Sequence, residues 1–192
     1  ADAEVEYKDH TSNTIYTSFE IKKTSKDFLK DCHIIIWTTT PWTIPVNRAL
    51  AYSDNIKYSV IQLGKDTEHF KDKNIIIASK LVRKVSEECN FKEFKILREF
   101  EGSDLKNTIC FHPFKKMGYD YDVPMLQGDF VTLEQGTGIV HSAPSHGPDD
   151  FNLCLKYGIK ASNTITDNGL YTDEIPFFSG VHIFKADNQV IE

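Results

Sequence analysis

The amino-acid sequence predicts a mixed α/β fold that is mainly β, with a barrel-like β core and a few peripheral helices. Apolar residues recur in many short runs that alternate with polar residues or are rich in Ile and Val, as strands are. Clusters of Gly, Asn, Asp and Ser separate these runs at short intervals, which is typical of turns. Clear helical patterns are confined to residues 80–89 and 149–157.

The chain opens with a predicted pair of strands in residues 4–21. Val5 and Tyr7 alternate with charged residues before a polar turn at residues 11–13, and apolar residues resume after it. Residues 22–32 are polar and rich in Lys, and they predict a loop or a short helix. Later apolar or alternating runs predict strands at residues 33–37, 49–52, 56–60, 74–78, 107–112, 123–127, 130–133 and 181–184.

The remaining segments are helical or irregular. Residues 80–89 predict a helix because their apolar residues recur at helical spacing. Residues 91–100 fit either a strand or a helix, and that choice stays open. Residues 113–122 predict an irregular loop, and residues 164–176 are rich in turn formers.

The helix predicted at residues 149–157 has a defined start and end. Pro148 suits the first helical position because its missing N–H would be unbonded there anyway, and Gly158 ends the segment. Asp149 and Asp150 then lie in the first turn, where the helix dipole favours negative charge. We expect this placement to keep a carboxylate ionised and in position for a ligand ammonium group.

The composition is that of a folded chain rather than a disordered one. The 192 residues are 40% apolar and include 13 Phe, so we expect one domain that covers residues 1–192. No stretch approaches the ~20 apolar residues that a membrane helix needs. Residues 1–10 are acidic and polar, unlike a signal peptide. We therefore expect a cytoplasmic protein without a membrane partner.

Charge and cysteine spacing argue against two simple classes of function. The net charge of −6 argues against an autonomous RNA-binding module, because proteins that grip a long duplex usually present a basic surface. The cysteines form no C-x-x-C pair, so we expect free thiols in a cytosolic protein rather than a zinc knuckle. They are Cys32, Cys89, Cys110 and Cys154.

Residues 136–150, GTGIVHSAPSHGPDD, form the most distinctive stretch of the chain. Two glycines bracket a threonine, and a short apolar pair then leads to His141. A turn with two prolines and His146 follows, and it ends in the adjacent carboxylates of Asp149 and Asp150. An oriented carboxylate at the edge of a pocket can bind a ligand ammonium group.

A second stretch joins an apolar run to a row of hydroxyl groups. Residues 33–37, HIIIW, lead directly into Thr38, Thr39 and Thr40, and Pro41 then stops the run. A hydrophobic core does not require hydroxyls and backbone amides at a strand end. Such groups can bind a ligand oxygen or a water, although a plain β-edge role for the threonines stays open.

These two stretches resemble a known family. WTTTPWTIPVN, followed about ninety residues later by GTGIVHSAPSHGPDDF, is similar to the editing domain of isoleucyl-tRNA synthetase, the CP1 insertion of the class I core. The related valyl and leucyl enzymes carry an arginine after the first two threonines, so Thr40 points to the isoleucyl type. The similarity covers nearly the whole chain, from AEVEYKDHTS to SGVHIFKA. The HIGH and KMSKS signatures are absent, so we expect an editing domain excised from a larger synthetase.

The resemblance implies hydrolysis of misattached valine. A pocket for isoleucine cannot strongly reject a ligand that is one methylene smaller, and this pair of amino acids is the standard illustration of that limit. A second, tighter site would hydrolyse the ester of Val-tRNA(Ile) while sparing Ile-tRNA(Ile), after the parent enzyme has ligated the amino acid to tRNA(Ile) using ATP. Because the ester is already activated, water needs mainly positioning and charge stabilisation.

The resemblance also implies catalytic and substrate-binding roles for particular residues. Asp150 is expected to bind the α-ammonium group of the misattached amino acid. Thr38, Thr39 and Thr40 are expected to line the acyl pocket and to order the water or the ester carbonyl. His141 is expected to form the wall that admits valine and clashes with isoleucine, and to hold the terminal ribose.

Other residues of the two motifs receive supporting or purely structural roles. Asn47 and Trp37 are candidates for supporting the substrate pocket. We expect Asp149 to be only a helix-start charge, His146 to hold the turn, and Trp42 to pack in the core or the loop.

Three other functions stay open. His141 and His146 with a nearby aspartate could bind a metal, but their five-residue spacing across a proline turn fits no usual zinc pattern. Ser142 or Ser145 with a histidine and an aspartate could form a serine esterase, although the chain has no G-x-S-x-G elbow. A non-catalytic module for the 3′ end of tRNA would bind without deacylation.

The expected partners follow from the same resemblance. They are the 3′ end of tRNA(Ile) carrying misattached valine and the remainder of the synthetase, with the chain itself a monomer. We expect the editing domain to need no metal or cofactor, since the ATP, Mg and any Zn belong to other parts of the parent enzyme.

Overall fold

The structure is a computed structural model that describes residues 13–64, 67 and 73–191. In these residues nine strands form one sheet with the order β6-β4-β5-β2-β1-β7-β8-β3-β9. The strand predicted around Val5 and Tyr7 lies outside the described residues. The bounds are β1 Ile15–Lys23, β2 Cys32–Thr38, β3 Ala49–Tyr52, β4 Lys57–Leu63, β5 Asn74–Ala78, β6 Phe94–Glu101, β7 Ile109–Phe111, β8 Asp122–Gln127 and β9 Val140–Ser142.

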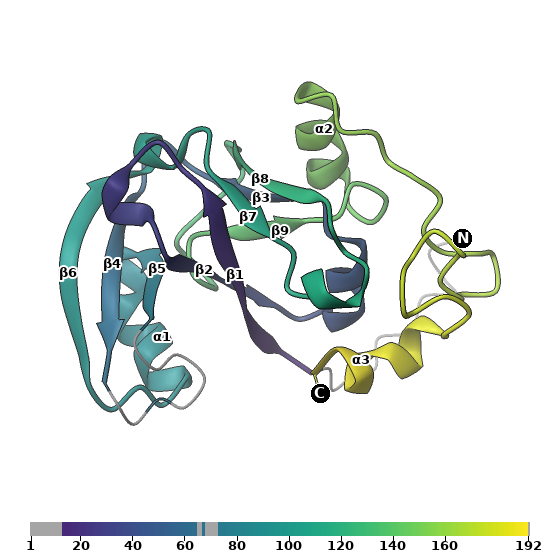
Figure 1. Cartoon of the computed structure of the whole chain (residues 1–192), viewed down its shortest axis with the longest axis horizontal. Helices are drawn as coiled ribbons and strands as arrows, with labels where there is room; N and C mark the ends of the chain where they lie inside the picture. Colours follow the sequence, from purple (N-terminus) through teal and green to yellow (C-terminus); the bar gives the residue numbers. More distant parts are fainter. Residues whose placement is uncertain (1–12, 65–66, 68–72, 192) are drawn as a thin grey trace, which may run out of the picture.

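The sheet is mixed and curls on itself (Figure 1). Most neighbours are antiparallel, but β2 pairs with β5 and β3 pairs with β8 in parallel. A register shift between Ile21 and Lys23 marks the end of β1 that pairs with β7, beyond its pairing with β2. Such irregularities bend a strand, and β9 comes back into contact with β2. The predicted mainly β core with peripheral helices is confirmed.

The core lies around β2, β4 and β5. Ile34, Ile35 and Ile36 of β2 are almost fully buried, as are Ile75 and Ile76 of β5. These strands are unbroken apolar runs because both of their faces are covered, as is usual for parallel neighbours within a sheet. This packing fixes the end of β2, from which the threonine loop starts.

Three α-helices border the sheet within the described residues: α1 Val82–Glu88, α2 Pro148–Lys156 and α3 Ile183–Ile191. A 3-10 helix, η3 Pro41–Val46, follows the threonines and contacts α3. Figure 1 shows α1 toward one end of the molecule and α3 toward the other. No helix in the described part of the chain is long and apolar enough to cross a membrane.

Two predicted strands are wrong. Residues 130–133 lie outside the sheet, because the chain turns at residues 129–130, where the Val131 N–H donates to the Gly128 carbonyl. Residues 181–184 make only an isolated bridge through His182 before α3 begins. Apolar residues at positions 183, 186 and 190 follow a helical period, and this longer pattern determines the structure. The open choice at residues 91–100 resolves to the strand β6.

Candidate functional site

The threonine loop begins where β2 leaves the core. The Thr40 N–H donates to the Thr38 hydroxyl over 3.0 Å, which closes a tight turn at the strand end. Pro41 then occupies the first position of η3, where its missing N–H is harmless. One turn later the Thr43 N–H donates to the Thr40 carbonyl over 3.0 Å. The loop therefore presents several hydroxyl groups on a short, fixed stretch of backbone.

His141 reaches this loop through the pairing of β3 with β9. The two strands are antiparallel with Leu50 opposite His141, so the residues just before β3 lie beside the imidazole. Asn47 is one of them: its side-chain nitrogen Nδ2 donates to the Ala49 carbonyl over 2.9 Å and lies 3.3 Å from His141 Nδ1. The other ring nitrogen, Nε2, lies 2.9 Å from the Thr43 hydroxyl oxygen.

The His141 ring is neutral. The side chain is buried, with 9% of its surface exposed, and burial lowers its pKa from 6.5 to about 4. Desolvation penalises the charged form of a histidine, so near pH 7 the ring carries no net charge.

Asp150 sits in the first turn of α2, close to the turn that precedes the helix. Its Oδ2 accepts the Ala143 N–H over 3.3 Å. A side chain at Gly147 would place a Cβ only 2.9 Å from the same oxygen, so glycine leaves room for the carboxylate.

The pKa of Asp150 moves in the opposite direction to the one that the helix start alone would favour. Burial raises the pKa of Asp150 above its ordinary value, and the Ala143 N–H and the Ser142 side chain only partly oppose this. Desolvation therefore outweighs the favourable contacts at the start of α2. A cation bound beside this carboxylate would stabilise its charged form.

These elements enclose a cavity of about 240 Å³. Four residues assigned to the site from the sequence line it, and they are Thr38, Thr40, His141 and Asp150. Four further residues complete the lining, and they are Trp42, Thr43, Ala143 and His146. The cavity thus combines hydroxyls, a neutral imidazole and a carboxylate from β2, η3, β9 and α2.

Three other predicted site residues lie around this cavity rather than on its wall. Thr39 is exposed, with its hydroxyl oxygen 3.4 Å from that of Thr40. Trp37 faces the opposite side of β2 from Thr38, because successive residues of a strand alternate between the two faces. Its side chain lies beside Gly136 there. Asn47 is fully buried behind the His141 ring.

Sequence reasoning missed two aspects of the lining. Trp42 and His146 were given only structural roles, yet their rings meet edge-on in the cavity wall with centroids 5.0 Å apart. Thr43 received no role, although a 3-10 helix brings residues i and i+3 to the same side. That spacing between Thr40 and Thr43 was a signal that could have identified it.

Comparison with known proteins identifies the family. The family model for the leucyl-tRNA synthetase editing domain matches residues 12–176. The chain belongs to this editing-domain family. The crystal structure of GlLeuRS-CP1 has the same fold, with a TM-score of 0.68 at 16% identity, covering 93% of this chain and 94% of that one.

The relatives in sequence are isoleucine–tRNA ligases. Isoleucine–tRNA ligase of Pelagibacter ubique (strain HTCC1062) is 59% identical over 192 residues, which is 100% of this chain and 21% of that protein. Isoleucine–tRNA ligase of Gluconobacter oxydans (strain 621H) is 43% identical over 197 residues, again 100% of this chain and 20% of that protein. The editing domain thus spans about a fifth of the length of these relatives.

The serine and metal alternatives gain no support from the geometry of the editing domain. The Ser142 hydroxyl oxygen is buried, and the Ser145 hydroxyl donates to the Ser162 carbonyl over 2.7 Å. Neither serine lines the cavity that holds His141 and Asp150. In the described ranges, no group of three or more His, Cys, Asp or Glu side chains is arranged to hold a metal ion.

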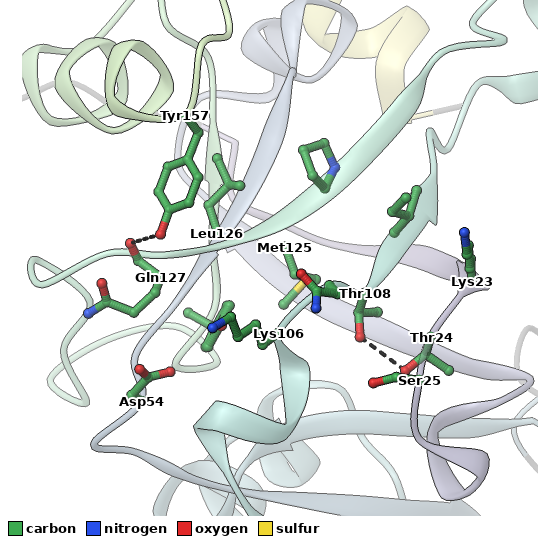
Figure 2. Close-up of a pocket in the computed structure, with 14 residues that line it drawn as sticks. Lys23, Thr24, Ser25, Asp54, Lys106, Thr108, Met125, Leu126, Gln127 and Tyr157 are labelled. Carbon is green, nitrogen blue, oxygen red and sulfur yellow. Dashed lines mark hydrogen bonds between the residues drawn. The ribbon is translucent and has the colours of Figure 1, made fainter.

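A larger hollow of about 610 Å³ lies elsewhere on the editing domain, beside β8 (Figure 2). Figure 2 shows the Thr24 and Thr108 hydroxyls joined by a hydrogen bond and Tyr157 bonded to the Gln127 carbonyl. Every site residue predicted from the sequence lies outside its lining. Size alone therefore favours this hollow, whereas the arrangement of carboxylate, hydroxyls and imidazole favours the smaller cavity.

Proposed function

We propose that this editing domain hydrolyses the aminoacyl ester of Val-tRNA(Ile) and spares Ile-tRNA(Ile). The observation that carries the proposal is the convergence of a half-buried carboxylate, three threonine side chains and a neutral imidazole on one small cavity. Each group meets one requirement of the reaction, namely to hold the amine, to position water at the ester and to limit the side chain.

Asp150 provides the anchor for the α-ammonium group. Burial raises its pKa, so the surroundings of the carboxylate disfavour its charge. An ammonium group at this position would form a charge-assisted hydrogen bond and stabilise the ionised form. The free amine also distinguishes an aminoacyl ester from a peptidyl ester, whose acylated amine lacks that charge.

The threonine hydroxyls position water rather than activate it strongly. Thr38 and Thr40 line the same cavity as the carboxylate. In the reaction, the water oxygen bonds to the ester carbonyl carbon, the bond from that carbon to the ribose oxygen breaks, and a proton passes to the ribose oxygen. Because the aminoacyl ester is already reactive, holding the water and the carbonyl in place supplies much of the necessary acceleration.

His141 limits the size of the amino-acid side chain. The ring is buried and has both nitrogens in hydrogen bonds, so it forms a firm wall of a cavity of only about 240 Å³. One additional methylene group in a tight apolar pocket changes discrimination by about 10- to 200-fold. The wall would therefore separate isoleucine from valine in the direction that editing requires.

The rest of the synthetase would present the substrate. The domain spans about a fifth of its relatives, and its net charge of −6 provides little general attraction for RNA. We infer that other parts of a cytoplasmic synthetase hold the tRNA body, while this domain receives only the 3′ end with its misattached valine.

A deacylation assay tests this function directly. Val-tRNA(Ile) and Ile-tRNA(Ile), each labelled in the amino acid, are incubated with the domain, with and without the remaining synthetase. We expect valine to be released about tenfold faster than isoleucine, or more, in at least one format. Binding of the tRNA end without release of either amino acid would instead support a non-catalytic module and overturn the proposal.

A further inference from the structure

The hydrogen bonds of Thr43 determine which nitrogen of His141 carries a proton. The Thr43 hydroxyl donates its single proton to the Thr40 carbonyl over 2.8 Å, because a carbonyl can only accept. The same hydroxyl oxygen lies 2.9 Å from His141 Nε2. Its proton is already used, so it can only accept there, and Nε2 must be the donor.

Asn47 imposes the same assignment independently. One proton of its amide nitrogen is directed to the Ala49 carbonyl over 2.9 Å, which fixes the orientation of the amide. The nitrogen then presents its second proton to His141 Nδ1 at 3.3 Å, so Nδ1 accepts. Two separate partners on opposite edges of the ring therefore require the neutral tautomer with the proton on Nε2.

We propose that Thr43 is a positioning residue that locks His141 in this tautomer and in one ring orientation, so that the imidazole acts as an inert wall that sets the preference for valine. The proposal rests on the proposed editing function and deepens it. With both nitrogens held, the ring has no proton or lone pair to offer the substrate. His141 therefore contributes shape, rather than acid–base chemistry or a bond to the ribose.

Thr43 is better placed than Asn47 to be the lock. Its contact with the ring is shorter, 2.9 Å against 3.3 Å, and it connects the ring to the Thr40 carbonyl within the threonine loop. Thr43 is itself buried, with 7% of its surface exposed. Without its oxygen, the Nε2–H would lose its acceptor in a buried site, and the ring would turn to find another partner in the cavity.

The first test is spectroscopic and does not depend on activity. Nitrogen-15 histidine correlation spectra of the whole domain report which ring nitrogen is protonated, with the His141 signals assigned by their loss in His141→Asn. We expect a single Nε2–H tautomer in the wild type and in Thr43→Ser, which keeps the hydroxyl. Thr43→Val has nearly the same shape without the hydroxyl, and we expect it to show mixed tautomers or exchange broadening.

A matched control separates the lock from general disturbance of the cavity. His146, which also lines the cavity, has its Nε2 2.8 Å from the hydroxyl oxygen of Thr164, a residue outside the lining. Thr164→Val should change the His146 signals and leave the His141 tautomer as it is. An unchanged His141 spectrum in Thr43→Val would overturn the lock.

The second test links the lock to specificity. The ratio of kcat/KM for Val-tRNA(Ile) to that for Ile-tRNA(Ile) should fall by about tenfold or more in Thr43→Val, and Thr43→Ser should recover it. Wild-type discrimination in a Thr43→Val protein whose tautomer has changed would refute the link to specificity. Failure of the proposed function itself would be seen separately, as a wild-type domain that releases neither amino acid.

Discussion

Two buried histidines, His112 and His141, contact neighbouring residues of the same 3-10 helix. His112 Nε2 donates to the Ile44 carbonyl over 3.0 Å, and its Nδ1 accepts the Phe114 N–H over 3.1 Å. His141 makes the corresponding pair of bonds with Thr43 and Asn47 side chains. Burial lowers the pKa of each ring to about 4.

What differs is the surroundings of the two rings. His112 stacks on Tyr119 with ring centroids 4.5 Å apart and also packs against Phe19 and Phe114, so its neighbourhood is an aromatic core. His141 lines a cavity that it shares with Asp150. The comparison shows that burial can lower the pKa of a histidine with no functional site nearby. A lowered pKa indicates a functional site only when the ring also faces a space that a ligand can enter.

The largest expected effect lies on the cavity side. Asp150→Asn keeps the size of the side chain but removes its charge, so hydrolysis of Val-tRNA(Ile) should fall by about 100-fold or more, as expected when one partner of a buried charge pair is lost. Steady-state deacylation measures the loss. The exposed neighbour in the same helical turn provides the matched control, because Asp149→Asn should retain most of the activity.

The core around His112 should not respond to this change. Thermal unfolding of Asp150→Asn should therefore match that of the wild type within a few degrees. Undiminished deacylation by a folded Asp150→Asn protein would remove the amine anchor from the mechanism and leave the two histidine environments functionally alike.

The next effect is one that the two rings should share. Each folded-state pKa, about 4, lies below the value of about 6.5 in an unfolded chain. The stabilisation is therefore complete above pH 6.5 and is lost as the pH falls toward 4, because the unfolded chain binds more protons over that range. Between pH 7 and pH 5 the free energy of unfolding should fall by about 2 kcal/mol for each ring.

Urea denaturation at the two pH values measures this dependence. His112→Phe and His141→Phe should each remove a similar share of it, although only one of the two rings faces the cavity. A pH dependence that disappears entirely in one variant would show that the two environments are not equivalent electrostatically.

Alanine substitution should separate the two rings by function. His141→Ala should allow Ile-tRNA(Ile) to be hydrolysed, lowering the discrimination between the two esters by about 10- to 100-fold. His112→Ala should instead lower the free energy of unfolding by about 2–4 kcal/mol, because it leaves a cavity and unpaired backbone groups, and it should keep the discrimination. If His141→Ala still spares Ile-tRNA(Ile), another residue acts as the sieve.

Local sequence patterns were sufficient for most of the sheet. The run HIIIW and its parallel neighbour NIIIA predict β2 and β5, because buried strands read as continuous β-branched residues. The failures at residues 130–133 and 181–184 are short apolar runs for which several structures compete. There the Gly128 turn and the longer period of α3 determined the result.

The site could be predicted only as a set of residue types. The motifs contain Thr38, His141 and Asp150, but nothing in their spacing places them on one wall. That arrangement depends on the register of β3 against β9. Contacts between distant residues, such as Thr43 with His141 or His146 with Thr164, require the folded chain, so these partners could not be read from the sequence.

The smallest expected effect concerns Tyr171, which contacts η3 in addition to His112 and His141. The Tyr171 hydroxyl donates to the Trp42 carbonyl, while the Trp42 N–H donates to Asp187 of α3 over 3.1 Å. Tyr171→Phe removes the first bond and should lower the free energy of unfolding by about 1 kcal/mol. Urea denaturation measures this loss, and the discrimination between the two esters should stay close to that of the wild type.

Tyr119→Phe is the matched control, since its hydroxyl also donates to a backbone carbonyl, that of Pro176, over 2.8 Å. Both variants should lose a similar amount of stability, because each loses one partly buried bond of the same kind. The contrary outcome is that Tyr171→Phe alone weakens the discrimination between the two esters as much as His141→Ala does. The position of η3 would in that case depend on the C-terminal segment as well as on His112 and His141. The wall of the cavity would then be set from three sides.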